Sequence, residues 1–316
     1  MSDLKVFRVR GEDAVEIPGV VSGDGSVRRV VLANAEAMLG VRVLATGYST
    51  GSRHGGRITG LGLDENDAPV VIEVEDGPGG DGVLARGVFF LDWLLDHRAD
   101  VRLLAAERLG PAGAAALDWR APRLICVAPG FSRYDVHLAA QLARPVDLVR
   151  AIALDGGLIA LEHLSPGRVD GDDAPAPRVV PGDPAADRHR NGGRSHAAYR
   201  TVSEDLASAP EHLQEAYAAL AGFVEGLGTD VTRRVRDTYI AYRRLRNFTC
   251  VEVDRREGAL LLYLRLDPDS VDIEDGFTRD VTHLGHFGTG YLEVRVPDRA
   301  ALERALPLVR ASYLAG

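Results

Sequence analysis

The chain has 316 residues, 46% of them hydrophobic and 26% charged, which places it among soluble globular proteins with room for two domains. No apolar run approaches the length of a membrane-spanning helix, and a formal net charge of −9 argues against a protein that coats nucleic acid without selectivity. The first residues lack an apolar signal segment, so a cytoplasmic protein with no membrane partner is expected.

The first half of the chain predicts a mixed α/β domain over residues 1–164. Apolar residues at helical spacing alternate with short runs of β-branched residues, and glycine or proline marks the ends of the runs. The predicted helices are 27–39, 83–97, 101–109 and 134–142, and the predicted strands are 41–48, 122–128, 146–153, 158–163 and the two arms of a hairpin within 56–76. This order favours a mixed sheet flanked by helices.

The hairpin at residues 56–76 carries the acidic side chains on which the functional interpretation depends. Side chains two apart in a strand share a face, so Glu73 and Glu75 point to the same side. Thr59 on the preceding strand comes near the two acids if the register allows. A solvated strand face is the simpler interpretation of the two glutamates.

The hairpin resembles the core of the PD-(D/E)XK nuclease superfamily, which has the restriction-endonuclease-like fold. The chain is also similar to a bacterial family that has such a domain at its N-terminus and is often labelled only as predicted transport proteins. The similarity lies in the segments STGSRHGGRITGLGLDEN, PVVIEVED, GVFFLDWLLDHRAD and DWRAPRLICVAPGFSRYDVHLAAQL. In the superfamily, an acid on one strand and Glu-x-Lys on the next hold a divalent metal ion and activate water for phosphodiester hydrolysis. YIAYRRLRNFTCVEV and GFTRDVTHLGHFGTGYLEV resemble the bacterial family's second domain, whose function is not assigned.

Two positions depart from the family's pattern. Thr59 stands where the family has Asp, Glu75 stands where it has Lys, and only Glu73 of the strand signature remains. Magnesium prefers several oxygen ligands and the lysine orients the attacking water, so these losses imply a catalytically degenerate nuclease fold without a cofactor. Arg86 opens the next helix and could neutralise an acid. The alternative is a rearranged magnesium or manganese site, with Glu36, Glu73 and Glu75 as ligands and with Glu36 and Glu73 as the catalytic residues.

The composition changes after residue 164. Residues 165–197 are rich in proline, glycine and charge and predict a disordered linker. Residues 198–316 predict a second, small α/β domain. Its first expected helix runs from about 203 or 210 to 225, and its last covers 299–313. Its expected extended segments are 231–243, 247–254, 259–266 and 291–296, and the stretch 267–290 is expected to be looser.

Arginine residues supply the candidate nucleic-acid contacts. Small residues in the glycine-rich loop at 49–56 let a backbone approach a phosphate, which arginine binds bidentately. In the second domain, arginines interleave with aromatic residues, a mixture that binds the backbone and stacks bases. The predicted contacts are Arg53, Arg57, Arg86, Arg243, Arg244 and Arg246. A flexible loop and an arginine-rich sheet edge that pairs with nearby acids are the simpler alternatives.

Two further pairs of residues, one of histidines and one of cysteines, carry predictions. His283 and His286 lie three apart in a glycine-rich loop and are predicted to bind an anion, because a third metal ligand is lacking. Cys126 and Cys250 lie in separate apolar runs and are predicted to be buried, reduced thiols.

Together these features predict a protein that binds nucleic acid, double-stranded DNA above all, without cutting it efficiently. The first alternative is an active metal-dependent nuclease with the rearranged acidic site. The second is a protein-interaction scaffold in which neither DNA nor metal matters. A homodimer is a further expectation, because duplex DNA offers two-fold sites to this fold.

Overall fold

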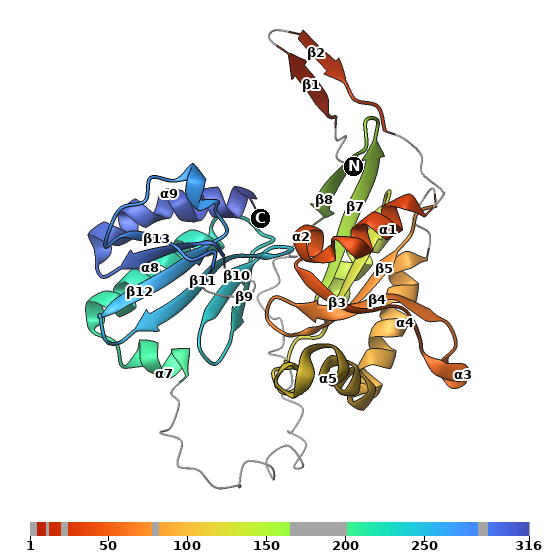
Figure 1. Ribbon diagram of the computed structural model, residues 1–316, viewed down its shortest axis with the longest axis horizontal. Coiled ribbons are helices and arrows are strands. Elements are labelled where there is room, and N and C mark those ends of the chain that lie inside the picture. The colour runs from red at the N-terminus through yellow and green to blue at the C-terminus, as the bar shows by residue number, and fades with distance from the viewer. Residues whose placement is uncertain are drawn as a thin grey trace, which may run out of the picture.

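A computed structural model describes residues 5–10, 13–19, 25–77, 82–164, 201–283 and 290–315. Within these residues the strands form two six-stranded sheets and a separate two-stranded sheet. Figure 1 shows the two large sheets in separate parts of the molecule, each with its own helices, so the predicted mixed α/β class is confirmed. We call the described residues up to 164 the N-terminal unit and those from 201 the C-terminal unit. The predicted linker at 165–197 lies outside the described residues.

The N-terminal unit is built around a mixed sheet in the order β3-β4-β5-β6-β7-β8. Strands β5, β6 and β7 run parallel to one another, and the remaining neighbours are antiparallel. The elements of this unit are β1 (Phe7–Arg10), β2 (Asp13–Glu16), α1 (Ser26–Ala33), α2 (Ala35–Leu39), β3 (Val41–Ser49), α3 (Gly51–His54), β4 (Arg57–Asp64), β5 (Pro69–Val74), α4 (Val83–Asp96), α5 (Arg98–Ala115), β6 (Arg123–Ala128), α6 (Arg133–Gln141), β7 (Val146–Leu154) and β8 (Leu158–Leu164).

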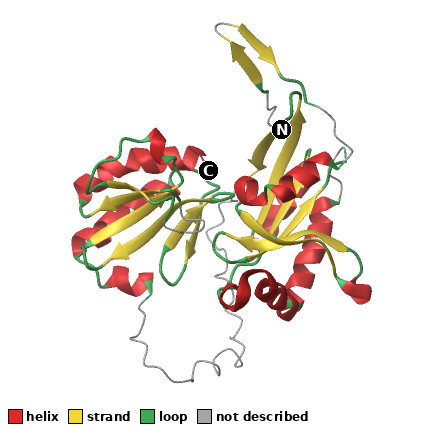
Figure 2. Cartoon of the chain, viewed as in Figure 1, coloured by secondary structure: helices red, strands yellow, loops and turns green. Residues whose placement is uncertain are grey.

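Helices cover both faces of this sheet (Figure 2). On one face, α1 and α2 pack against the sheet in a core that contains Val31 and Ile72. On the other face, α4, α5 and α6 share a core with Val71 and Leu94. Because Val71 and Ile72 are neighbours in β5 and face opposite cores, the alternation predicted for the hairpin is confirmed.

The predicted elements differ from the structure mainly at their ends. The helix expected at 27–39 is divided at Asn34, whose non-helical backbone separates α1 from α2, and Gly40 ends α2 in the left-handed conformation. The loop expected at 49–56 contains the short helix α3. Helix α5 continues beyond residue 109 because the chain kinks at Gly110 and resumes a helical course.

The C-terminal unit is an antiparallel sheet in the order β13-β14-β12-β11-β10-β9, and its helices share one core with the sheet. The extended segment predicted at 231–243 is two strands, and the stretch 267–290 contributes a further short strand. The elements of this unit are α7 (Val202–Ala207), α8 (Glu211–Glu225), β9 (Thr232–Val235), β10 (Ile240–Arg243), β11 (Asn247–Asp254), β12 (Ala259–Leu264), η2 (Pro268–Ser270), β13 (Thr278–Asp280), β14 (Leu292–Val296) and α9 (Arg299–Ala315).

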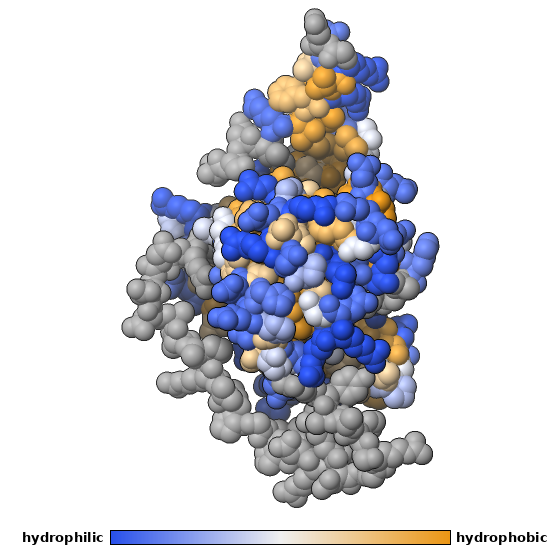
Figure 3. Space-filling model, turned by 90° about the vertical axis from the view of Figure 1, so that its left-hand side faces the viewer, coloured by the Kyte–Doolittle hydropathy of each residue, from blue (hydrophilic) through white to orange (hydrophobic). Residues whose placement is uncertain are grey.

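The hairpin of β1 and β2 projects away from the large sheets (Figure 1). All eight of its strand residues are exposed, including Phe7, Val9 and Val15. Figure 3 shows hydrophobic side chains gathered on this projection, above a mostly hydrophilic face. The two cysteines are buried free thiols, as predicted. Among the described helices, none is long and apolar enough to cross a membrane.

Candidate nucleic-acid interface

The predicted acidic hairpin forms a compact polar cluster on the face of the sheet that α4 covers. The Thr59 backbone N–H donates to Glu73 Oε1 at 2.8 Å, and the Thr59 hydroxyl donates to Glu73 Oε2 at 3.0 Å. Both bonds follow from the antiparallel register of β4 and β5, which pairs Gly60 with Ile72 and so sets Thr59 beside Glu73. The register thus brings Thr59 to Glu73, whose side chain is 1% exposed.

Arg86, the fourth residue of α4, completes this cluster. Its Nε donates to Glu73 Oε2 at 2.9 Å, and its Nη2 donates to Glu75 Oε2 at 3.3 Å. Although burial opposes the charge, the hydrogen bonds and the two nearby carboxylates raise the pKa of Arg86. Burial also acts against ionised Glu75, yet the Gly77 N–H and Arg86 lower the pKa of that carboxyl. We call Thr59, Glu73, Glu75 and Arg86 the carboxylate cluster.

The predicted third ligand, Glu36, is not part of the carboxylate cluster. It is exposed on α2, and α2 packs on the opposite face of the sheet from α4. Among the residues that the structure describes, no group of three or more His, Cys, Asp or Glu side chains is arranged to hold a metal ion. The structure therefore separates Glu36 from Glu73 and Glu75 and sets the Arg86 guanidinium beside the pair.

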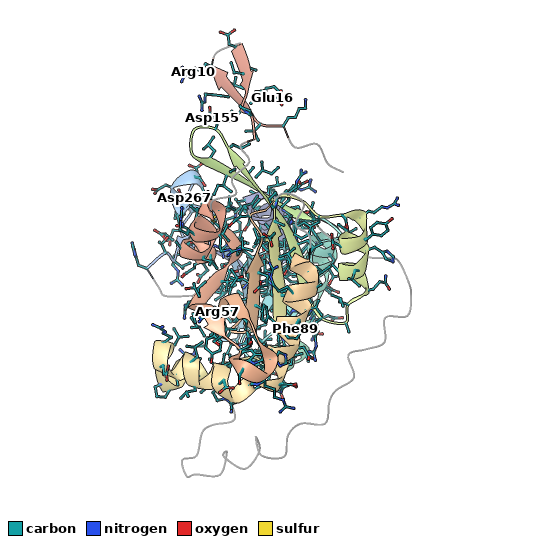
Figure 4. All side chains as sticks on the ribbon, turned by 90° about the vertical axis from the view of Figure 1, so that its right-hand side faces the viewer. Arg10, Glu16, Arg57, Phe89, Asp155 and Asp267 are labelled. Carbon is teal, nitrogen blue, oxygen red and sulfur yellow. The ribbon has the colours of Figure 1, made fainter. Side chains whose placement is uncertain are left out.

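Arg53 and Arg57 flank the turn between β3 and β4, at one end of the same sheet. Both side chains are exposed, and Arg57 Nη1 donates to the Gly47 carbonyl at 3.0 Å. Between them, the His54 ring lies against the Phe89 ring of α4 with centroids 4.7 Å apart. We call Arg53 and Arg57 the cationic tip. Figure 4 labels Arg57 and Phe89. Phe89 lies three residues after Arg86 on α4, so the turn that carries Arg53 and Arg57 lies near the carboxylate cluster.

Arg243, one of the arginines predicted for the second domain, has a different role. Arg243 is 4% exposed and reaches into the N-terminal unit, where its Nη1 donates to Asp64 Oδ2 at 2.8 Å. Arg123, which is 1% exposed, donates from Nε to Asp147 Oδ2 at 2.7 Å and from Nη2 to the Leu245 carbonyl at 2.9 Å. Each arginine also lies within 3.7 Å of the other's aspartate. We call Asp64, Arg123, Asp147 and Arg243 the inter-unit network.

Charges balance in this network, since it contains two arginines and two aspartates. Burial acts against ionised Asp147, but Arg123, a hydrogen bond with His163 and Arg243 hold the pKa of its carboxyl well below the usual range. Burial, with the repulsion of Arg123, lowers the pKa of Arg243 to about 10, so its guanidinium remains charged at neutral pH. The network is therefore a cluster of buried ion pairs.

Neutral and charged groups extend the contact between the units. The side-chain amides of Asn66 and Asn247 exchange two hydrogen bonds, each of 3.1 Å. Glu65 accepts from the Asn247 N–H at 2.6 Å and also from Arg265. Arg236 Nη1 donates to Asp118 at 2.7 Å. The turn between β4 and β5 is thus held by the C-terminal unit.

Of the three arginines predicted as contacts in the second domain, Arg243 needs correction. Arg243 is buried in the inter-unit network, Arg244 pairs with Asp230, and Arg246 donates to the Ala37 carbonyl. Burial removes Arg243 from the candidate interface, whereas Arg244 and Arg246 are only partly buried and stay predictions. Of the predicted anion-binding pair, His283 is exposed and His286 lies outside the described residues.

Sequence reasoning missed the other members of the inter-unit network. Arg123 is the first residue of β6, which is otherwise apolar, and Asp147 is the second of β7, where Arg150 is the other charged residue. A charged residue within a buried strand is the available signal, because such a group requires a partner. The 45% exposure of Phe89 was also not predicted from the sequence.

Comparison with known proteins finds a family model that matches the C-terminal unit and a distant relative that spans both units. A model of the family described as "Domain of unknown function (DUF5655)" matches residues 202–315. The chain is 23% identical over 256 residues to an "Uncharacterized protein" of Haemophilus influenzae, which covers 80% of this chain and 82% of that protein. An alignment of this length exceeds either unit, so the similarity extends over both. No solved structure matches the chain.

Proposed function

We propose that the protein binds double-stranded DNA through its N-terminal unit, on a nuclease-like fold that does not cleave the phosphodiester efficiently. The observation that carries the proposal is the position of the Arg86 guanidinium against Glu73 and Glu75. An arginine in this place supplies a fixed positive charge to the two carboxylates. It stays protonated, so it cannot act as a base toward water.

The fold of the unit supports the resemblance to PD-(D/E)XK nucleases. The resemblance implies a mixed sheet flanked by helices with an acidic hairpin, and the N-terminal unit has such a sheet, with Glu73 on the second strand of the hairpin. Both departures from the family's pattern lie in the carboxylate cluster, where Thr59 donates two hydrogen bonds to Glu73 and Glu75 contacts Arg86.

The hydrogen bonds within the carboxylate cluster disfavour hydrolysis of a phosphodiester. Each oxygen of Glu73 already accepts a hydrogen bond from Thr59 or Arg86. A hard divalent cation needs several oxygen ligands, and here it would have to displace the guanidinium first. Glu36 lies on the other side of the sheet and cannot complete the ligand set. Binding without cleavage is the function that this arrangement supports best.

The cationic tip supplies the proposed phosphate contacts. Arg53 and Arg57 are exposed, and within the described residues neither guanidinium has an acidic partner. By contrast, the arginines of the inter-unit network are buried. Exposed guanidinium groups at one end of the sheet, next to Arg86, can bind successive phosphates bidentately. Their small number fits selective binding by an acidic protein better than general coating of nucleic acid.

The double variant Arg53→Ala/Arg57→Ala tests this contact. We expect it to bind a fluorescent duplex roughly tenfold more weakly than the unchanged protein, because two phosphate contacts are lost. The slope of log affinity against log salt is expected to become less steep by about 2. Fluorescence anisotropy over a series of salt concentrations measures both quantities.

Arg102→Ala/Arg108→Ala is the matched control. It removes the same charge from exposed positions on α5 in the same unit. An equal loss of affinity in both double variants would show that net charge, and not the cationic tip, determines binding. An unchanged affinity in Arg53→Ala/Arg57→Ala would remove the tip from the interface.

A further inference from the structure

The ring of Phe89 is an exposed aromatic surface among cations. Its residue is 45% exposed on α4, and its ring lies 4.7 Å from the His54 ring and 5.5 Å from the Phe90 ring, measured between centroids. A phenylalanine that served only the core would be covered by its neighbours. Here the neighbouring rings support Phe89 from within and leave part of it in solvent.

The arginines of the cationic tip are fixed close to this ring by the chain itself. Arg53 precedes His54, which contacts Phe89, and Arg57 follows Gly56, where an added Cβ would lie 3.1 Å from the Phe90 ring. Adjacent Cα atoms are about 3.8 Å apart, so both arginines emerge within one residue of the contacts with α4. The exposed Phe89 ring and the backbone of both arginines therefore lie close together.

This combination matches the chemistry of an unpaired nucleotide. A base stacks on an aromatic ring whatever its sequence, and arginine binds the adjoining phosphates. In an intact duplex the bases are already stacked on one another, so Phe89 gains a partner only where a base is unpaired. Tyr134 is another exposed aromatic of this unit, but Arg133 already lies over its ring, at 4.9 Å from the centroid.

We infer that Phe89 stacks on an unpaired base, so that the protein prefers DNA in which a duplex ends in a single-stranded segment. This inference rests on the proposed DNA binding and adds the structural class of the DNA. The duplex lies along the exposed arginines, and the first unpaired base of the overhang covers the Phe89 ring. A blunt duplex makes the phosphate contacts without the stacking contact.

Fluorescence anisotropy with two labelled DNAs tests the inference: a blunt duplex and the same duplex with a single-stranded overhang. The unchanged protein should bind the overhang DNA more tightly. Phe89→Leu keeps apolar bulk against Phe90 and removes the π face, so it should lower affinity for the overhang DNA by roughly 5- to 150-fold, the value of one stacked base. Its affinity for the blunt duplex should not change.

Tyr134→Ala is the control for a general effect of exposed aromatic residues, and it should bind both DNAs as the unchanged protein does. Equal binding of both DNAs by the unchanged protein, or loss of the preference in Tyr134→Ala and not in Phe89→Leu, would overturn the stacking role and leave the proposed function standing. If neither DNA binds at all, the proposed function fails as well.

Discussion

Replacing Arg243 with alanine is expected to lower the free energy of unfolding by about 3–5 kcal/mol, the usual cost of removing one partner of a buried ion pair. Asp64 and Asp147 would then share the single guanidinium of Arg123, although both carboxylates are buried. The lost side chain also joins the two units, so the C-terminal unit should unfold more independently. Urea unfolding followed by fluorescence and circular dichroism measures both effects.

Two comparison variants make this prediction specific. Arg256→Ala removes an exposed arginine from the turn between β11 and β12 and should change stability by less than about 0.5 kcal/mol. Asp64→Asn in the Arg243→Ala background should recover part of the loss, because it removes one of the unbalanced charges and keeps the oxygen that accepts from the Asn66 N–H. A cost for Arg243→Ala no larger than that for Arg256→Ala would contradict the buried network.

Replacing Arg86 with alanine is expected to cost about 1–3 kcal/mol, the range for a hydrogen bond to a charged group whose partner is left buried. Glu73 would keep its bonds from Thr59 but lose its cation, while its side chain is 1% exposed. The cost should be below that of Arg243→Ala, because the Arg86 side chain is 37% exposed and solvent screens the pair. Thermal and urea unfolding at neutral pH measure it.

The double variant Arg86→Ala/Glu73→Gln distinguishes charge pairing from simple packing. A neutral amide no longer needs the guanidinium, so the double variant should be more stable than Arg86→Ala alone. Arg102→Ala, on the exposed side of α5, is the matched single replacement and should be nearly neutral. If Glu73→Gln adds its own cost to that of Arg86→Ala without any recovery, the two side chains are not energetically coupled and the cluster as described is wrong.

The local sequence pattern was sufficient to predict most of the helices and strands. Alternation in β5 predicted correctly that Glu73 and Val71 share a face opposite Ile72, because side-chain direction in a strand has a fixed period. The division of the helix at Asn34 was not predicted, because the apolar spacing continues across it. The contact between Thr59 and Glu73 was predicted only on condition of a suitable strand register, since the pairing of two strands depends on the turn between them.

The inter-unit network could not be predicted in the same way. Arg243 lies 179 residues from Asp64 in the chain, and nothing in its neighbourhood shows that a distant carboxylate will bury it. Its neighbours are arginines and aromatic residues, which suggested a nucleic-acid surface. What decides between the two uses of arginine is the packing of the units, and that is a property of tertiary structure. The expected cytoplasmic location and homodimer stay predictions.

DNA binding without cleavage is tested most directly on one gel. Labelled double-stranded and single-stranded DNA are incubated with the purified chain in chelator and in manganese, and both retardation and cleavage are scored. We predict that the duplex is retarded in both conditions, because Arg53 and Arg57 require no metal, and that no shortened products form, because Arg86 occupies the carboxylate cluster. Manganese-dependent cleavage that Glu73→Ala abolishes, or no retardation in either condition, would contradict the proposed function.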